Sequence, residues 1–387
     1  GGAEVAVAVG LTGWKLMEAL FRIGEKNPAD LVRLLEEEDP LKVNTVTSPN
    51  AFECPAGEEQ FSEPDVRDHE AEERFKEGQG FVYYQHLRKA GGTENRGRAL
   101  CEISGWQARE REIVPVYHCM PDNRGAMATP PWSDSQHLLK EMEANGYRIT
   151  ANEWDAFPAS HLELTGAVFG TTFRHPVDRW YSQYRFEHVE HRDGTKPGAI
   201  PLPFDRWYQQ MKPYTMGDNY YVKTFCGQSN PPDKTLLKDT NKQGKPKHVA
   251  DLSWSYHKFN HWGSKVSFGN FRAAVENLRK FNLILILEFV EDEMWALEES
   301  LGWRQARKQQ VLPHERQAVR QDKKSISARE ALDSSVWTST IESNVFDLLL
   351  FHWAKRMYLE RSACRKNVAN NAGMAIANLP PKTDINQ

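Results

Sequence analysis

A buried strand that runs directly into a glycine pair constrains the fold of this chain more than any other feature. Residues 81–98, FVYYQHLRKAGGTENRGR, begin with an apolar, aromatic run typical of a strand, break at residues 90–93, and resume with residues that can enter a helix. Two glycines let the backbone fold closely around an anion, while the N–H groups of the helix start and the Lys89 ammonium group can bind it. The segment therefore indicates a phosphate site, although an ordinary strand-to-helix turn with a surface lysine has the same pattern.

A second segment adds a pair of anion-binding side chains. Residues 168–188, VFGTTFRHPVDRWYSQYRFEH, predict a strand over 168–173 and a helix with Pro176 in its first turn, where a missing N–H costs little. Arg174 ends the strand and Ser182 lies two turns into the helix, so both can reach one anion over the helix start. Taken alone, Arg-x-Pro-x-x-Arg-x-x-Ser is more often a solvated helix start with a salt bridge.

Together, the two segments resemble the sulfotransferases that use 3′-phosphoadenylyl sulfate (PAPS), in particular the membrane-bound carbohydrate group that includes the heparan sulfate 2-O- and 6-O-sulfotransferases. In that family, a Lys-Ala-Gly-Gly-Thr loop holds the 5′-phosphosulfate of the donor, and an Arg-x-Pro-x-x-Arg-x-x-Ser segment holds its 3′-phosphate. Residues 218–227, 283–303 and 346–358 resemble later landmarks of the family, so the resemblance covers about residues 80–361. It implies a P-loop-NTPase-like sulfotransferase fold, PAPS as donor, 3′-phosphoadenosine 5′-phosphate (PAP) as product, and no metal.

The resemblance also assigns the donor contacts. Lys89 should approach the bridging oxygen of the phosphosulfate and neutralise the charge that develops there. Two positions depart from the family: Glu94 follows the loop where Ser or Thr is usual, and His175 stands where Asp is usual. The lysine pair at 323–324 is a further candidate, although such a pair is more often a wet surface. The predicted donor-binding residues are Lys89, Ala90, Gly91, Gly92, Thr93, Arg174, Ser182, Lys323 and Lys324.

The reaction also needs a base. Transfer of a sulfuryl group to a hydroxyl is a displacement in which positioned cations stabilise the leaving phosphate and a base takes the proton of the attacking oxygen. Glu153 follows a short predicted strand over 147–150, and it occupies the place at which related carbohydrate sulfotransferases carry a catalytic glutamate. A strand-end glutamate is otherwise only a solvated carboxylate. His161, on the segment that follows, is the alternative base.

Net charge and composition limit the class of molecule that the chain can bind. A net charge of −4 excludes a generally polycationic nucleic-acid binder, yet it allows local basic patches that bind phosphate or an acidic polysaccharide. Basic and aromatic residues after residue 188 can line a groove for an acidic glycan, and a solvated loop before an ordinary helix explains them at least as well. No cysteine or histidine spacing gives a complete metal site. The predicted acceptor contacts are His188, His191 and Arg192.

The order of the predicted elements favours one large α/β domain. Strands and helices alternate after residue 79, which is typical of a parallel sheet with helices on both faces and ligands at the carboxyl ends of its strands. We expect this sulfotransferase domain over 79–361. Residues 1–78 are predicted to form a helical extension that packs against it and an acidic, exposed linker over 55–78, and 362–387 a disordered tail.

Localisation depends on the resemblance. It implies a single-pass type II protein of the Golgi lumen with an anchor upstream of residue 1, since no run of the sequence is apolar enough to span a membrane. Five cysteines leave at least one thiol unpaired within a luminal chain, and the absence of an Asn-x-Ser/Thr acceptor counts mildly against a glycosylated luminal enzyme. The sequence predicts no oligomeric state.

Two other functions fit parts of the pattern. A nucleotide-dependent, kinase-like transferase would use a related sheet, but the chain lacks a Gly-x-x-x-x-Gly-Lys-Ser/Thr loop and an obvious carboxylate partner for magnesium. A catalytically silent nucleotide- or glycan-binding protein would keep the fold without the transfer. The leading prediction is an O-sulfotransferase that acts on a hydroxyl of a glycan or polysaccharide.

Overall fold

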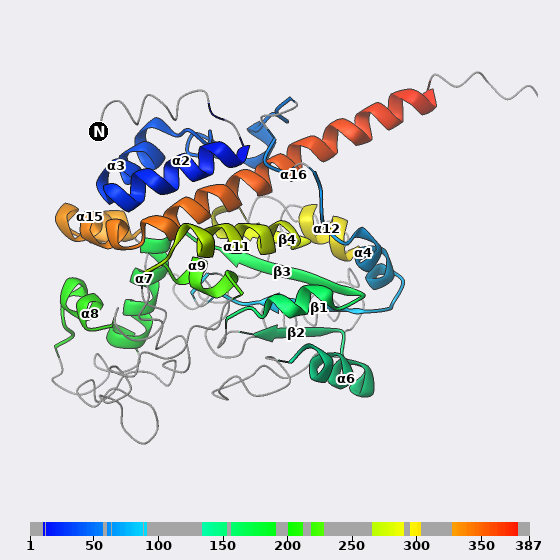
Figure 1. Cartoon of the computed structure of the whole chain (residues 1–387), viewed down its shortest axis with the longest axis horizontal. Coiled ribbons are helices and arrows are strands. Elements are labelled where there is room, and N and C mark those ends of the chain that lie inside the picture. The colour runs from blue at the N-terminus through cyan, green and yellow to red at the C-terminus, as the bar shows by residue number, and fades with distance from the viewer. Residues whose placement is uncertain are drawn as a thin grey trace, which may run out of the picture.

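The computed structural model describes residues 11, 13–56, 60–62, 64–87, 89–90, 134–152, 156–190, 200–211, 218–227, 265–289, 295–302 and 327–377 of the 387-residue chain. Figure 1 shows most of these residues as coloured ribbons.

A four-stranded parallel sheet forms the centre of the described chain (Figure 1). Its strands are β1 (Phe81–Gln85), β2 (Ile149–Asn152), β3 (Ala167–Phe173) and β4 (Leu283–Ile286), and they lie in the order β2-β1-β3-β4. Every neighbouring pair is parallel, and every strand residue is buried. Burial on both faces explains why the strands are mostly apolar in the sequence. The predicted α/β fold with a parallel sheet is confirmed at this level.

Helices pack around this sheet. One long helix, α16, contacts β4, while α4 contacts β3 and α9 lies against α11. The helices and helical turns are α2 (Gly13–Lys26), α3 (Pro28–Arg33), η1 (Leu34–Glu38), η2 (Pro49–Ala51), α4 (His69–Lys76), α6 (Ser135–Asn145), η4 (Ala159–Glu163), α7 (Pro176–Tyr184), η5 (Arg185–Glu190), α8 (Phe204–Met211), α9 (Tyr220–Phe225), α11 (Phe268–Arg279), η7 (Leu287–Phe289), α12 (Trp295–Leu301), α14 (Ala328–Ala331), α15 (Ser334–Ser343) and α16 (Val345–Ala377).

Local sequence signals set several helix ends. Helix α3 begins after Asn27, whose side chain accepts a hydrogen bond from the N–H of Ala29 at 3.2 Å, and Pro28 occupies the first turn. Helix α6 begins after Asp134, which caps it in the same way, and ends at Gly146 with a φ of 62°. That left-handed conformation favours glycine at a helix end.

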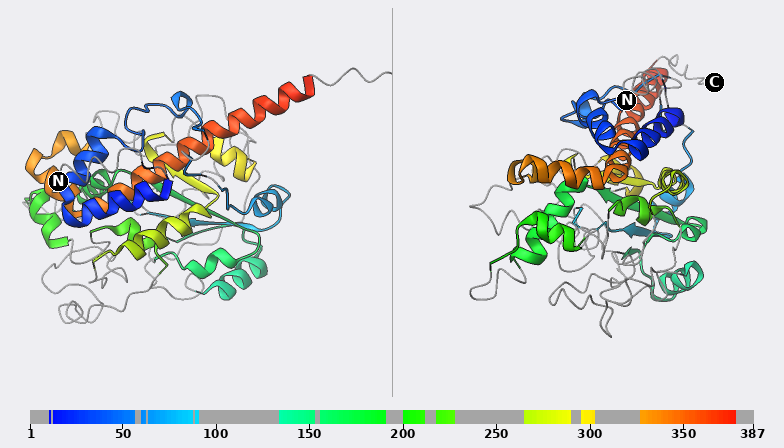
Figure 2. Two further views of the ribbon diagram at one scale, coloured as in Figure 1. Left: turned by 45° about the horizontal axis from the view of Figure 1, so that its top comes forward. Right: turned by 60° about the vertical axis from the view of Figure 1, so that its left-hand side comes forward.

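The N-terminal helices share the core of the sheet. Leu16, Leu20 and Phe21 of α2 are buried in the same hydrophobic cluster as the strand residues. The Phe21 ring stacks on Phe346 of α16, with 4.1 Å between the ring centroids. Figure 2 shows α2 lying along α16. The described part of residues 1–78 therefore has no separate core of its own.

Helix α16 also binds the chain that follows these N-terminal helices. The buried Glu360 carboxylate accepts hydrogen bonds from the backbone N–H groups of Phe61 and Ser62, both at 2.8 Å. A buried carboxylate needs such donors, because it has lost its contact with water. Four residues further along the helix, Cys364 forms a disulfide with Cys54. Polar and covalent bonds therefore join α16 to the N-terminal segment.

Two predictions about the flanking segments were wrong in part. The stretch 55–78, expected to be an exposed linker, contains helix α4, in which Glu72 and Phe75 are buried. The Glu72 carboxylate accepts a hydrogen bond from the Asn282 side chain at 2.8 Å, which compensates for its burial. Residues 362–377, expected in a disordered tail, continue helix α16.

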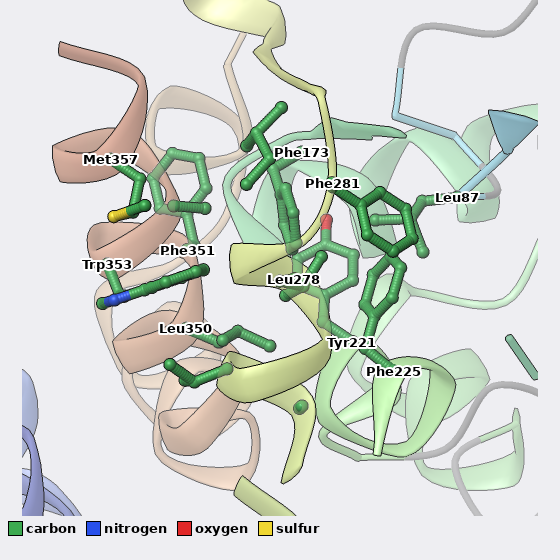
Figure 3. Close-up of a cluster of buried hydrophobic side chains, with 14 of the residues drawn as sticks. Leu87, Phe173, Tyr221, Phe225, Leu278, Phe281, Leu350, Phe351, Trp353 and Met357 are labelled. Atoms are coloured by element: carbon green, nitrogen blue, oxygen red, sulfur yellow. The ribbon is translucent and has the colours of Figure 1, made fainter. Parts of the chain in front are cut away.

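An aromatic cluster packs at the carboxyl end of β3. Figure 3 shows Phe173 of β3 beside Tyr221 and Phe225 of α9 and beside Phe281, with side chains of α16 on the other side of the cluster. The rings of Phe173 and Tyr221 meet nearly at right angles, with 5.1 Å between their centroids, an arrangement that aromatic pairs favour. This packing places α9 against the end of β3.

Candidate functional site

Strand order brings the two predicted anion-binding segments together. Strands β1 and β3 are neighbours, with Gln85 opposite Thr171, so the loops that leave them start at the same edge of the sheet. The chain passes from β1 to β2 on one side and from β3 to β4 on the other. In open α/β sheets, ligands bind where the strand order reverses in this way. Lys89 follows β1 and Arg174 follows β3 at this point.

The contact between these two residues is direct. Nη1 of Arg174 donates a hydrogen bond to the carbonyl oxygen of Lys89, at 3.3 Å. The Arg174 side chain is half-buried, and within the described ranges no carboxylate pairs with it. A partly buried cation without a counter-ion favours an anionic ligand, because the ligand supplies the missing attraction.

Lys89 lies in a sharp and strained turn. Its φ of 64° is left-handed, a conformation that costs a residue other than glycine about 1 kcal/mol. The N–H of the next residue, Ala90, donates to the carbonyl of Leu87 at 3.0 Å. Nζ of Lys89 lies 3.9 Å from the ring centroid of Phe186 in η5, four residues after Ser182. The turn therefore directs the ammonium group toward the segment that carries Ser182. Gly91, Gly92 and Thr93 lie outside the described residues.

The two arginines of the second segment have different surroundings. Arg179 is fully buried, and its guanidinium carbon lies 4.7 Å from the ring centroid of Trp180 and 4.8 Å from that of Tyr220. Packing therefore occupies Arg179, whereas Arg174 stays half-buried at the end of β3. Ser182 is also half-buried, and its hydroxyl has no side-chain partner in the described part of the chain. Of the Arg, Arg and Ser positions of the motif, Arg174 and Ser182 are thus the two with surface left to contact a ligand.

The two candidate bases differ in what the structure describes of them. The ring of His161 is fully buried, with Nδ1 2.8 Å from Oγ of Ser135 and its centroid 5.0 Å from that of Tyr83. A side chain without exposed surface does not meet an acceptor hydroxyl in this conformation, so its placement favours a packing role. Glu153 lies outside the described residues, directly after Asn152, the last residue of β2.

His188, predicted to contact the acceptor, is buried instead. Its Nε2 accepts a hydrogen bond from the N–H of Leu202 at 2.7 Å. Its ring lies against Tyr184 and Trp207, with centroid separations of 5.6 and 6.4 Å. This placement favours a role in holding the chain that enters α8. His191, Arg192, Lys323 and Lys324 lie outside the described residues.

His175 connects the loop after β3 to the N-terminal segment. Its ring stacks on Trp337 of α15 at 5.3 Å, and its Nε2 lies 3.6 Å from Oε1 of Glu36 in η1. Nε2 of His352 lies 3.5 Å from the same oxygen. Burial raises the pKa of Glu36, but hydrogen bonds and charge from the two histidines outweigh burial, so its pKa is lowered overall. The residue next to Arg174 is therefore anchored by a carboxylate from the N-terminal segment.

Two residues outside both segments contact the backbone at Arg174. The hydroxyl of Tyr221 donates to the carbonyl oxygen of Arg174 at 2.6 Å, and the Glu288 carboxylate accepts from the N–H of His175 at 3.0 Å. Neither residue stands out in the sequence, because a side chain that bonds to a distant backbone leaves no spacing pattern. Their only signal is position, since Tyr221 lies in the landmark 218–227 and Glu288 in the landmark 283–303.

Neither a membrane span nor a metal site is found in the described part of the chain. No helix there combines the length and the apolar character that crossing a membrane requires. Within the same residues, no group of three or more His, Cys, Asp or Glu side chains is arranged to hold a metal ion.

Comparison with known proteins does not assign this chain to a family. No protein-family model matches the sequence, and a search of curated protein sequences finds no significant match. The function therefore has to be inferred from the residues around Lys89 and Arg174.

Proposed function

We propose that this protein is an O-sulfotransferase that moves the sulfuryl group of PAPS to a hydroxyl of a glycan, on a sulfotransferase-type fold related to P-loop nucleotide-binding domains. The observation that carries the proposal is the hydrogen bond from Arg174 to the carbonyl of Lys89, at 3.3 Å. PAPS carries a 3′-phosphate and a 5′-phosphosulfate on one ribose, so it needs two anion-binding groups close together. The contact supports the assignment of both segments to that one ligand.

Each proposed role follows from chemistry and position. Arg174 and Ser182 would bind the 3′-phosphate, and Lys89 the 5′-phosphosulfate. In the transfer, the acceptor oxygen bonds to sulfur while the bond from sulfur to the bridging oxygen breaks, and its electron pair stays with PAP. The Lys89 ammonium group stabilises the charge on that oxygen. Glu153 takes the proton of the acceptor hydroxyl, and the buried position of His161 makes it the weaker alternative.

The disulfide bears on the proposed compartment. A bond between Cys54 and Cys364 forms and persists in an oxidising environment, which supports a luminal compartment such as the Golgi. The upstream type II anchor is proposed on the family resemblance alone. An acidic polysaccharide is the proposed acceptor, with His191 and Arg192 as its contacts directly after η5.

Donor binding is the first test. We expect PAP to bind and to raise the melting temperature at concentrations where ATP does not. Lys89→Ala should weaken PAP binding, while Lys140→Ala, at an exposed lysine on α6, should leave it unchanged. Binding of ATP in preference to PAP would favour the kinase-like transferase instead.

Transfer is the second test. Labelled sulfate from PAPS should appear on at least one member of a panel of desulfated polysaccharides. Glu153→Gln should retain PAP binding and lose most of the transfer, because the amide cannot accept the proton. Binding of PAP by the wild type without transfer of sulfate to any member of the panel would favour the silent binding protein.

A further inference from the structure

The peptide unit that joins Arg174 to His175 is bound at both ends by side chains from other elements. Its carbonyl oxygen accepts the hydroxyl hydrogen of Tyr221 on α9, at 2.6 Å. Its N–H, which belongs to His175, donates to the carboxylate of Glu288 in η7, at 3.0 Å. Neither residue belongs to the two anion-binding segments. Two bonds of opposite direction therefore fix the plane of this peptide.

Tyr221 is itself held firmly. Its backbone N–H and that of Val222 donate to the two oxygens of the Asp347 carboxylate on α16, at 2.9 and 3.0 Å. Its ring is fully buried beside Phe173, and Figure 3 shows it standing among the rings of the aromatic cluster. Burial raises the pKa of Tyr221 well above its usual value, so its hydroxyl keeps the proton that it donates.

Glu288 reaches the peptide because of sheet register. Phe173 of β3 is opposite Ile286 of β4, so the residues just beyond these two lie at the same edge of the sheet. Glu288 is the second residue after Ile286, and His175 is the second after Phe173. The carboxylate therefore belongs to the neighbouring strand exit and accepts the N–H where β3 gives way to α7.

We propose that Tyr221 and Glu288 are positioning residues that aim the Arg174 side chain at the 3′-phosphate of the donor. The inference rests on the proposed function. The fixed peptide plane sets the direction in which the side chain leaves Cα, and a small rotation there moves the guanidinium group by a larger distance. Displacements of about 1 Å are enough to weaken a charged contact strongly. The guanidinium needs this control because it leaves the end of a strand, where the backbone is no longer held by the sheet.

The test compares PAP with adenosine 5′-phosphate, which lacks only the 3′-phosphate. The ratio of the two dissociation constants isolates the contribution of that phosphate. Tyr221→Phe, which removes one hydroxyl, should reduce the ratio about fivefold, the change equivalent to one neutral hydrogen bond. The affinity for adenosine 5′-phosphate should stay constant. Tyr220→Phe, at the adjacent buried tyrosine whose ring lies against Arg179, should leave the ratio unchanged.

Glu288 provides an independent pair of variants. Glu288→Gln keeps an oxygen acceptor for the N–H of His175 and should preserve most of the ratio. Glu288→Ala removes the acceptor and should reduce the ratio by a similar factor to Tyr221→Phe. If Tyr221→Phe and Glu288→Ala both bind with the wild-type ratio, the two residues do not position Arg174. If the wild type itself does not distinguish PAP from adenosine 5′-phosphate, the proposed function fails, and the inference fails with it.

Discussion

The guanidinium group of Arg174 lies 3.3 Å from the carbonyl oxygen of Lys89, although 85 residues separate the two in the chain. The adjacency of β1 and β3 produces this contact, because parallel neighbours end at the same edge of the sheet. The carbonyl oxygen of Lys89 takes up one N–H of Arg174, whereas the guanidinium group has five N–H donors in all. The remaining donors of Arg174 can therefore bind phosphate oxygens while the first holds the Lys89 turn.

Replacing Arg174 should weaken binding of the doubly phosphorylated nucleotide selectively. Hydrogen bonds to charged groups contribute about 1.5 to 3 kcal/mol, so Arg174→Ala should weaken PAP binding about ten- to a hundredfold. The affinity of the same variant for adenosine 5′-phosphate should fall much less. Titration calorimetry measures both constants, and Arg272→Ala, at an exposed arginine on α11, is the control. Equal losses for the two nucleotides would contradict a role in 3′-phosphate binding.

The sheet could be predicted because its strands are buried on both faces and are therefore mostly apolar in the sequence. Their order could not, since it depends on contacts between strands far apart in the chain. The prediction of one anion site depended on that order. Helix α4 was missed because its composition is acidic, although Ala71 and Phe75 recur at helical spacing and are buried.

Side-chain type alone could not separate residues available to a ligand from residues that pack in the core. Arg174 and Arg179 belong to one motif, but the helix turns Arg179 into the core against Trp180. His161 and His188 have the chemistry expected of a base and of an acceptor contact, yet both are buried, in part by residues distant in the sequence. The hydrogen bond of His188, for example, comes from the backbone of residue 202.

The disulfide between Cys54 and Cys364 should contribute substantially to stability, because it closes a separation of 310 residues. Loss of a native disulfide typically costs about 2 to 5 kcal/mol. The double variant Cys54→Ser/Cys364→Ser should therefore unfold at a clearly lower urea concentration than the wild type. Peptide mapping without reduction should recover the two cysteines in one linked peptide. Recovery of both as alkylated thiols from unreduced protein would rule out the bond.

Glu36 should stabilise the protein near neutral pH, and this contribution should be lost in acid. Its pKa is lowered in the folded state, so its contribution is present above the pKa of the unfolded chain and is lost as the pH falls through the folded value. Burial lowers the pKa of its partner His352, which acts in the same direction. Asp178 and Arg329 also face this cluster.

The matched pair Glu36→Gln and Glu37→Gln tests this contribution. Glu37 is the exposed neighbour in η1 and has no ion pair in the described part of the chain. At pH 7, Glu36→Gln should destabilise the fold by about 2 kcal/mol, and the difference from wild type should shrink toward pH 3. Glu37→Gln should follow the wild-type curve at every pH. A constant penalty for Glu36→Gln between pH 7 and pH 3 would show that its charge is not responsible.

Asp347 should have the opposite effect on the pH dependence of stability, because its contribution is lost as the pH rises. Burial is the largest influence on this carboxyl, and it raises the pKa of Asp347 to about 7. A raised folded pKa means that the contribution is complete below the unfolded pKa and is lost as the pH rises through about 7. Asp347 accepts hydrogen bonds from two backbone N–H groups and lies near the charges of Arg179 and Lys223. These interactions lower its pKa, but they offset only part of the rise that burial causes.

The slope of stability against pH, rather than its absolute value, tests this prediction. Asp347→Asn has no proton to release, so its free energy of unfolding should change less between pH 5 and pH 9 than that of the wild type. The variant also loses one acceptor oxygen, which lowers stability by a similar amount at every pH and leaves the slope untouched. Parallel curves for the two proteins would mean that Asp347 ionises in the folded state as easily as in the unfolded chain. In that case its carboxylate would cap α9, and through Tyr221 hold Arg174, with its full charge across this range.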